Sequence, residues 1–167
     1  MSTYNFRKGA FNDTEPLQVL AMDSWSHFRN ELTPGNWEQL NATLHNKNTF
    51  VHLLETADCI VCTTKDQKIA GMVFLIPSGN PTDIYPENWC YIRFLTVSPA
   101  HSGKGIGRCL TQQCIDLAQQ RGEHTIALHT SEMMTNARRL YEHMGFEIVK
   151  EIPARLGKRY WLYKRAL

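Results

Sequence analysis

Seven consecutive residues in the middle of the chain have the composition of a phosphate-binding turn: Ser102-Gly103-Lys104-Gly105-Ile106-Gly107-Arg108. They follow an extended apolar run, 91–97, and open a run with helical periodicity that ends near Arg121. A glycine-rich turn at the start of a helix directs several backbone N–H groups and the positive end of the helix dipole at one point. This pattern predicts the binding of a phosphate-bearing ligand. The alternative is a tight strand-to-helix turn that needs glycine only for its geometry.

Three familiar phosphate-binding motifs do not fit this run. The P-loop string G-x-x-x-x-G-K-S/T occurs nowhere in the chain. In the dinucleotide fingerprint G-x-G-x-x-G, Arg108 stands where the last glycine belongs. The other signature elements of a protein kinase are absent from the sequence. What remains is G-x-G-x-G between a strand and a helix. Lys104 and Arg108 add positive charge to it, unless they are only solvated surface cations.

The composition limits the classes of function. A chain of 167 residues fits one domain, 1–167, with its own core. The formal net charge of +2 is too small to indicate nucleic acid as a partner. No apolar run reaches the ~20 residues that a membrane helix needs. The five cysteines are an odd count spread over apolar segments, which predicts a reduced, cytoplasmic protein. Cys59 and Cys62 lie in one strand with thiols on opposite sides, which argues against a metal or redox site.

The patterning along the chain predicts a mixed α/β fold. Two strands around the polar turn 65–68 should form a hairpin, and a strand–helix–strand unit, 89–130, should be parallel and right-handed. The outer strands should be antiparallel. Strands are expected at residues 3–8, 59–64, 69–76, 89–97, 125–130, 146–151 and 159–164. Helices are expected at residues 14–32, 34–44, 106–121 and 137–144.

The turn and the segments on either side of it together resemble the GCN5-related N-acetyltransferase (GNAT) superfamily. The first segment, Leu95-Thr96-Val97-Ser98-Pro99, leads into the turn, which is similar to that family's cofactor motif. The second is similar to the family's A-x-x-L-Y-x-x-x-G-F signature: Ala137-Arg138-Arg139-Leu140-Tyr141-Glu142-His143-Met144-Gly145-Phe146. Two motifs in the same order, with a strand between them, are more specific than either alone.

The resemblance implies a six- to seven-stranded mixed sheet, flanked by helices, that splays between the strands ending at Val97 and Thr130. Acetyl-CoA, as cosubstrate, would lie in this opening, and no metal is implied. Its diphosphate would contact the backbone N–H groups from Gly103 to Arg108. Its pantetheine arm would pair with the backbone of Leu95 to Val97 like an added strand.

The chain departs from the family at two positions. Ser102 stands where the family usually has arginine or glutamine, so a hydroxyl would replace one charged phosphate contact. Met134 stands where many members have asparagine, three residues before the alanine of the second motif. Asn136, directly before that alanine, is the residue expected to reach the cofactor arm instead.

Tyr141 has the position of the tyrosine that protonates the departing thiolate in the family. A phenol suits this role because it stays protonated at neutral pH. Helical spacing alone favours another interpretation, in which Tyr141 only packs with its helical neighbours. The resemblance also implies that a backbone N–H of the splayed strand polarises the thioester carbonyl. The general base stays open between water, Glu87 and His129, and His129 also fits a hydrogen-bonded core histidine.

Arg93 places a positive charge within the apolar strand 89–97. A buried guanidinium is costly unless it has an anionic partner. One interpretation is that Arg93 binds a carboxylate of the substrate. The alternative is a structural ion pair with an aspartate or glutamate from a neighbouring element.

These observations predict an acetyl-CoA-dependent N-acetyltransferase acting on a primary amine. A small-molecule amine is the first choice of acceptor, because the chain is compact and near neutral, and a protein N-terminus or lysine is the second. Two other classes remain: a module that binds acyl-CoA without turnover, and a nucleotide-binding protein that uses the turn for ATP. The acceptor is expected to enter beside residues 14–44 and the loop 77–88. The resemblance leaves a homodimer open, since dimers are common in the family.

Overall fold

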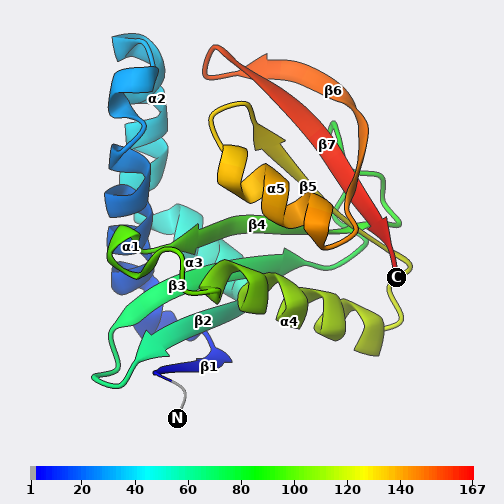
Figure 1. Cartoon of the computed structure of the whole chain (residues 1–167), viewed down its shortest axis with the longest axis horizontal. Coiled ribbons are helices and arrows are strands. Elements are labelled where there is room, and N and C mark those ends of the chain that lie inside the picture. The colour runs from blue at the N-terminus through cyan, green and yellow to red at the C-terminus, as the bar shows by residue number, and fades with distance from the viewer. Residues whose placement is uncertain (1–2) are drawn as a thin grey trace.

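The computed structural model describes residues 3–167, and its centre is a seven-stranded sheet with strand order β1-β2-β3-β4-β5-β7-β6 (Figure 1). Neighbouring strands are antiparallel except β4 and β5, which run parallel. The mixed fold class expected from the sequence is confirmed. The strands are β1 (Tyr4–Lys8), β2 (Asp58–Thr64), β3 (Ile69–Ile76), β4 (Cys90–Val97), β5 (Thr125–Ser131), β6 (Glu147–Arg155) and β7 (Lys158–Ala166).

Helices pack on both faces of this sheet. Figure 1 shows α4 and α5 on the near face, with α1 and α2 standing along one side and α3 behind. The helices are α1 (Thr14–Ser26), α2 (Pro34–His45), α3 (Lys47–Thr56), α4 (Ile106–Gln120) and α5 (Thr135–His143). Among residues 3–167, no helix has the length and apolar character needed to cross a lipid bilayer.

Two clusters of buried side chains lie on opposite faces of the sheet. The first joins α1, α2 and α3 to the sheet, and the second joins α4 and α5 to the other face. Consecutive strand residues alternate between them, so Tyr91 belongs to the first cluster and Ile92 to the second. Cys59 and Cys62 also fall in different clusters. Burial of both faces explains why β3 is apolar throughout.

The sheet opens between its two parallel strands. Only Cys90 and Tyr91 of β4 pair with β5, although β4 continues to Val97 and β5 to Ser131. A β-bulge in β4 lies just past this point, where the register with β3 shifts and Phe94 has a φ of +50°. The separation of the two strands confirms the splayed sheet and leaves one backbone edge of β4 without a strand partner.

The structure corrects the expected elements in three places. The first helix ends at Ser26 rather than at residue 32, because the Ser26 hydroxyl donates to the backbone oxygen of Asp23 (2.6 Å) and a 3-10 turn, 29–31, follows. Helix α3 was not predicted, although Asn46 caps it by accepting from the backbone N–H of Asn48 (3.1 Å). The last two strands run on to the tight turn at 156–157.

Candidate active site

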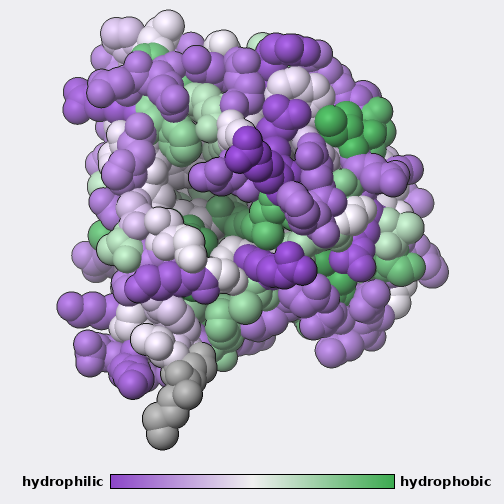
Figure 2. All heavy atoms as spheres, viewed as in Figure 1, coloured by the Kyte–Doolittle hydropathy of each residue, from purple (hydrophilic) through white to green (hydrophobic). Residues whose placement is uncertain are grey.

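Two cavities lie at the opening of the sheet, and both are lined by Trp25, Leu95, Thr96 and Met134. The larger has a volume of about 510 Å³ and extends along the end of β4 toward the start of α5. The smaller, of about 230 Å³, extends between β4 and β5 toward α2, the turn between β6 and β7, and the start of β7. Figure 2 shows a hollow with hydrophobic residues at its floor near the middle of this face. The bulged part of β4 is therefore the place where two ligands can meet.

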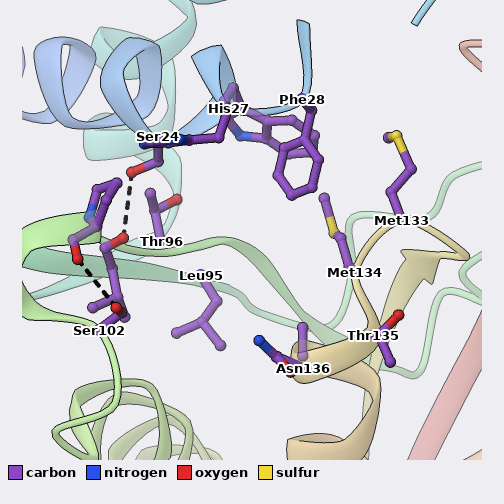
Figure 3. Close-up of a pocket in the computed structure, with 14 residues that line it drawn as sticks. Ser24, His27, Phe28, Leu95, Thr96, Ser102, Met133, Met134, Thr135 and Asn136 are labelled. Carbon is purple, nitrogen blue, oxygen red and sulfur yellow. Dashed lines mark hydrogen bonds between the residues drawn. The ribbon is translucent and has the colours of Figure 1, made fainter. Parts of the chain in front are cut away.

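The larger cavity collects most of the residues expected to hold the cofactor arm. Leu95, Thr96 and Val97 line it from β4, Ser102 from the turn before α4, and Asn136 from the first turn of α5. Figure 3 shows Leu95 and Asn136 pointing toward each other across the cavity. The arrangement offers an unpaired strand edge on one side and a side-chain amide on the other.

The glycine turn lies beside this cavity at the N-terminus of α4. The first intrahelical hydrogen bond runs from Cys109 N to Gly105 O (3.0 Å), so the N–H groups of residues 106–108 have no partner within the helix. Gly103 and Gly105 have φ values of +73° and +78°, which favour glycine, and a Cβ on either would meet open space. Lys104 and Arg108 are exposed. These features suit a diphosphate bound by main-chain N–H groups.

Gly107 has a different role from the other two glycines. It does not have a positive φ, and a Cβ there would lie 3.5 Å from Leu140 of α5 and 3.8 Å from Val97. Its side-chain position therefore faces the contact between α4 and α5. Gly103 and Gly105, by contrast, have positive φ values and open space where a Cβ would lie.

Tyr141 lines the smaller cavity from α5 and is 6% exposed. Its ring meets the ring of Phe146 edge to face (centroids 5.8 Å apart), so it packs in the core as helical spacing suggested. Its hydroxyl has no hydrogen-bond partner among residues 3–167. Burial raises its pKa above the ordinary tyrosine value, which keeps the phenol protonated. Tyr141 can thus donate a proton to a group that enters the cavity.

Arg93 is exposed, and the expectation of a buried guanidinium was wrong. Strand β4 is buried on both faces only while β5 lies beside it, and β5 has separated from β4 by this point. Arg93 forms no ion pair with any residue in the described part of the chain, which removes the structural-pair alternative. Its guanidinium lies 5.2 Å from the ring centroid of Phe94, and the side chain lines the smaller cavity.

His129 lines the same cavity from β5, and its ring forms a hydrogen bond with a tyrosine that lies outside the cavity. Its Nδ1 lies 2.6 Å from the hydroxyl oxygen of Tyr85, whose ring stacks on Tyr91 (centroids 4.0 Å apart). Burial, with the nearby charges of Arg155 and Arg93, lowers the pKa of His129 to about 4. The imidazole is therefore neutral at pH 7 and a weak base.

No carboxylate lines either cavity in the part of the chain that the structure describes. Glu87, an earlier candidate for the general base, lies on an exposed loop and lines neither cavity. The loop 77–88 contributes no lining residue, contrary to the expected acceptor entrance, whereas α2 contributes Leu40, Thr43 and Leu44. No group of three or more potential metal ligands occurs among residues 3–167.

The sequence did not identify the apolar half of the larger cavity. Figure 3 shows Phe28, from the chain just after α1, pointing toward Met134 of the turn that follows β5. Trp25 and Met133 complete this wall. No local pattern marks Phe28 or Met133, because each belongs to a short connection.

Comparisons of the sequence with known proteins point to one family. The model described as Acetyltransferase (GNAT) family matches residues 19–146. Human N-acetyltransferase 8B is 28% identical over 99 residues, which are 59% of this chain and 43% of that protein. The L-methionine sulfoximine/L-methionine sulfone acetyltransferase of Salmonella typhimurium is 35% identical over 57 residues, 34% of this chain and 33% of that protein. The matches thus span less than half the length of these curated relatives.

Solved structures share the fold over the whole chain. The PaiA N-acetyltransferase of Thermoplasma acidophilum, in complex with coenzyme A, has a TM-score of 0.78 at 17% identity and covers 100% of both chains. A GCN5-related N-acetyltransferase from Rhodopseudomonas palustris has a TM-score of 0.79 at 16% identity, covering 100% of this chain and 98% of that one. At such low identity, the likeness concerns the fold.

Proposed function

Because the chain belongs to the acetyltransferase (GNAT) family, we propose that it transfers an acetyl group from acetyl-CoA to the primary amine of a small molecule. The observation that carries this proposal is the meeting of the two cavities at Leu95 and Thr96, where the sheet opens. One cavity takes the acyl donor and the other the acceptor. The reaction centre then lies at the bulge of β4.

The residues around the larger cavity fit acetyl-CoA. The N–H groups at the start of α4, with Lys104 and Arg108, would hold the diphosphate. The free edge of β4 from Leu95 to Val97 offers backbone groups to the amide-bearing pantetheine arm. Asn136 faces this edge and would bind the same arm. Acetyl-CoA supplies the activated thioester, and the chain supplies binding and a proton.

The transfer forms a C–N bond to the acceptor and breaks the C–S bond of the thioester. The proton that the departing thiolate needs comes from Tyr141, whose hydroxyl has no other partner and lines the acceptor cavity. The nitrogen of the acceptor loses one proton as the amide forms. Water carries this proton to the phenolate of Tyr141 and so restores the phenol. A backbone N–H at the bulge of β4 polarises the carbonyl.

The size of the smaller cavity supports the proposal of a small acceptor. Its volume of about 230 Å³ lies below the ~300–1,000 Å³ typical of sites for drug-sized ligands. Away from the acyl donor, side chains of α2 line it, together with Leu156 of the turn between β6 and β7 and Tyr160 of β7. Arg93, which has no anionic partner in the described chain, would contact an acidic group of the acceptor.

The proposal is tested by following thiol release from acetyl-CoA with a panel of small amines and of peptides that carry a free N-terminus or lysine. Thiol release with one or more small amines is expected. Turnover of peptides alone would replace the small-molecule acceptor with a protein acceptor. Binding of coenzyme A without thiol release for any amine would leave only an acyl-CoA-binding module. Calorimetry that finds ATP bound more tightly than coenzyme A would overturn the assignment of the glycine turn.

A further inference from the structure

The hydrogen bond between Tyr85 and His129 fixes which nitrogen of His129 carries a proton. The Tyr85 hydroxyl has no other partner among the described residues. The hydroxyl proton therefore forms a hydrogen bond only if Tyr85 donates it to His129 Nδ1. A neutral imidazole whose Nδ1 accepts must carry its proton on Nε2. His129 therefore presents an N–H donor, and not a basic lone pair, to the acceptor cavity that it lines.

The geometry of Tyr85 is held firmly enough to maintain this tautomer. Tyr85 is 2% exposed and stacks on the ring of Tyr91 with an interplanar angle of 10°. Its backbone is closed into a tight turn with Thr82: the Thr82 N–H donates to Tyr85 O (3.0 Å), and the Tyr85 N–H donates to Thr82 Oγ1 (3.1 Å). Tyr85 does not line the cavity itself, so it acts through His129.

A second donor lines the same cavity. Arg93 has no anionic partner, whereas the other nearby guanidinium, Arg155, lies 3.6 Å from the carboxylate of Asp83. The low pKa of His129 keeps its ring neutral, which leaves Arg93 as the charged group of the cavity wall at pH 7. A site with a guanidinium, an imidazole N–H and no lining carboxylate complements an anion.

We propose that Arg93 and His129 together bind a carboxylate of the acceptor, so that the substrate class is an amine that carries a carboxylate, such as an amino acid. Tyr85 is the positioning residue that makes His129 a donor. This inference rests on the proposed acetyl transfer. It also excludes polyamines as good acceptors, because a second ammonium group would meet Arg93 with no lining carboxylate to neutralise it.

The experiment compares matched acceptors by thiol release. Each of the standard amino acids is assayed beside its carboxamide, and spermidine is included as a polycation. The acid of the best pair is expected to exceed its carboxamide in kcat/KM by about tenfold or more, the range of a charge-assisted hydrogen bond. Arg93→Gln is expected to lower kcat/KM for the acid more than for the carboxamide and so to remove this preference. Equal use of acid and carboxamide, or a preference for spermidine, would overturn the inference.

Tyr85→Phe tests the positioning role, and Tyr91→Phe is its matched control. Both remove one phenol hydroxyl from the same stacked pair, but the Tyr91 hydroxyl donates to Asn80 O (3.1 Å) and does not contact His129. Tyr85→Phe is expected to raise KM for the amino acid about threefold to tenfold, with kcat and the KM of acetyl-CoA nearly unchanged. Tyr91→Phe is expected to leave the preference for the acid intact. Equal effects of the two variants would contradict the role of Tyr85.

A spectroscopic measurement tests the tautomer without any variant. Nitrogen NMR of the wild-type protein at pH 7 is expected to show His129 neutral, with its proton on Nε2. A proton on Nδ1 would overturn the inference even if the variants failed to fold. Thiol release only with amines that lack a carboxylate would overturn the carboxylate site. If no amine gave thiol release, the proposed acetyl transfer would be overturned, and this inference with it.

Discussion

The hydroxyl of Ser24, in the last turn of α1, donates a hydrogen bond to the backbone oxygen of Val97, the last residue of β4 (3.3 Å). This contact ties the end of α1 to the free edge of the splayed strand, as Figure 3 shows. It places Trp25 and Phe28 opposite the turn after β5 and so defines the width of the larger cavity. It also uses one of the backbone groups that the pantetheine arm was expected to meet.

Replacing Ser24 with alanine is expected to lower the free energy of unfolding by about 0.5–1 kcal/mol, the value of one neutral hydrogen bond. The Kd for coenzyme A should change by less than about threefold, because the Val97 oxygen has a second lone pair available to the cofactor arm. Denaturant unfolding and calorimetry measure the two quantities. Weakening of coenzyme A binding by more than tenfold would show that Ser24 itself holds the cofactor.

Replacing Gly105 with alanine is expected to weaken coenzyme A binding at least tenfold, because the side chain would enter the open space above the turn. The positive φ of +78° adds a strain of about 1 kcal/mol. Gly79→Ala is the matched control, since Gly79 has a φ of +92° in an exposed loop and a Cβ there also meets open space. It should lose similar stability and bind coenzyme A normally. Equal affinities of the two variants would place the diphosphate elsewhere.

The cofactor side of the site could be predicted from sequence because its residues are local to two motifs. Leu95, Thr96, Val97 and Ser102 lie within eight residues of one another, and Asn136 precedes the second motif. The side chains that meet them from α1 could not be predicted. Trp25 and Met134 are far apart in the chain, and only the packing of α1 across the end of β4 brings them together.

The error at Arg93 has a physical origin in the sheet. An apolar strand such as 89–97 predicts burial on both faces, and this holds at Tyr91 and Ile92, which are buried. The pattern of one strand cannot show where its neighbour separates from it. Exposure begins where the pairing with β5 ends, and Arg93 is the first residue of β4 that is exposed. The polar residue marked the opening of the sheet rather than a buried ion pair.

Replacing Tyr141 with phenylalanine is expected to lower kcat for thiol release by about 10²–10⁴-fold, the usual contribution of a general acid. The Kd of acetyl-CoA should stay the same, and stability should change little because the hydroxyl has no partner to lose. Tyr163→Phe is the control: Tyr163 is buried in the same cluster, but its hydroxyl donates to Glu142 (3.0 Å) and accepts from Arg138 (3.1 Å). This control should lose stability and keep thiol release. Full kcat in Tyr141→Phe would assign the tyrosine to packing alone.

Stability is expected to fall as the pH is lowered from 6.5 to about 4, the interval between the ordinary and the folded-state pKa of His129. In this interval the unfolded chain binds a proton on His129 and the folded protein does not, so lowering the pH favours unfolding. The loss amounts to at most about 3 kcal/mol. The hydrogen bonds with Arg7 lower the pKa of Asp13, and this shift affects the free energy of unfolding only below the ordinary value of 3.8. Denaturant unfolding at several pH values should show the slope, and His129→Gln should remove it; a slope that persists in this variant would contradict the assignment.

The pH dependence of turnover is expected to follow the acceptor rather than the protein. The amine must be neutral to attack, and free amines have pKa values of about 8–10. No carboxylate lines the cavities in the described chain, and His129, with a pKa of about 4, does not change charge near neutrality. The raised pKa of Tyr141 keeps the proton donor intact beyond the ordinary tyrosine range. Log kcat/KM should therefore rise with a slope near one until the pKa of the acceptor is reached. For two acceptors whose amines differ in pKa, the rising parts of the plots of log kcat/KM against pH should be displaced by that difference. A rise near pH 6–7 that is the same for both acceptors would reveal a general base in the protein.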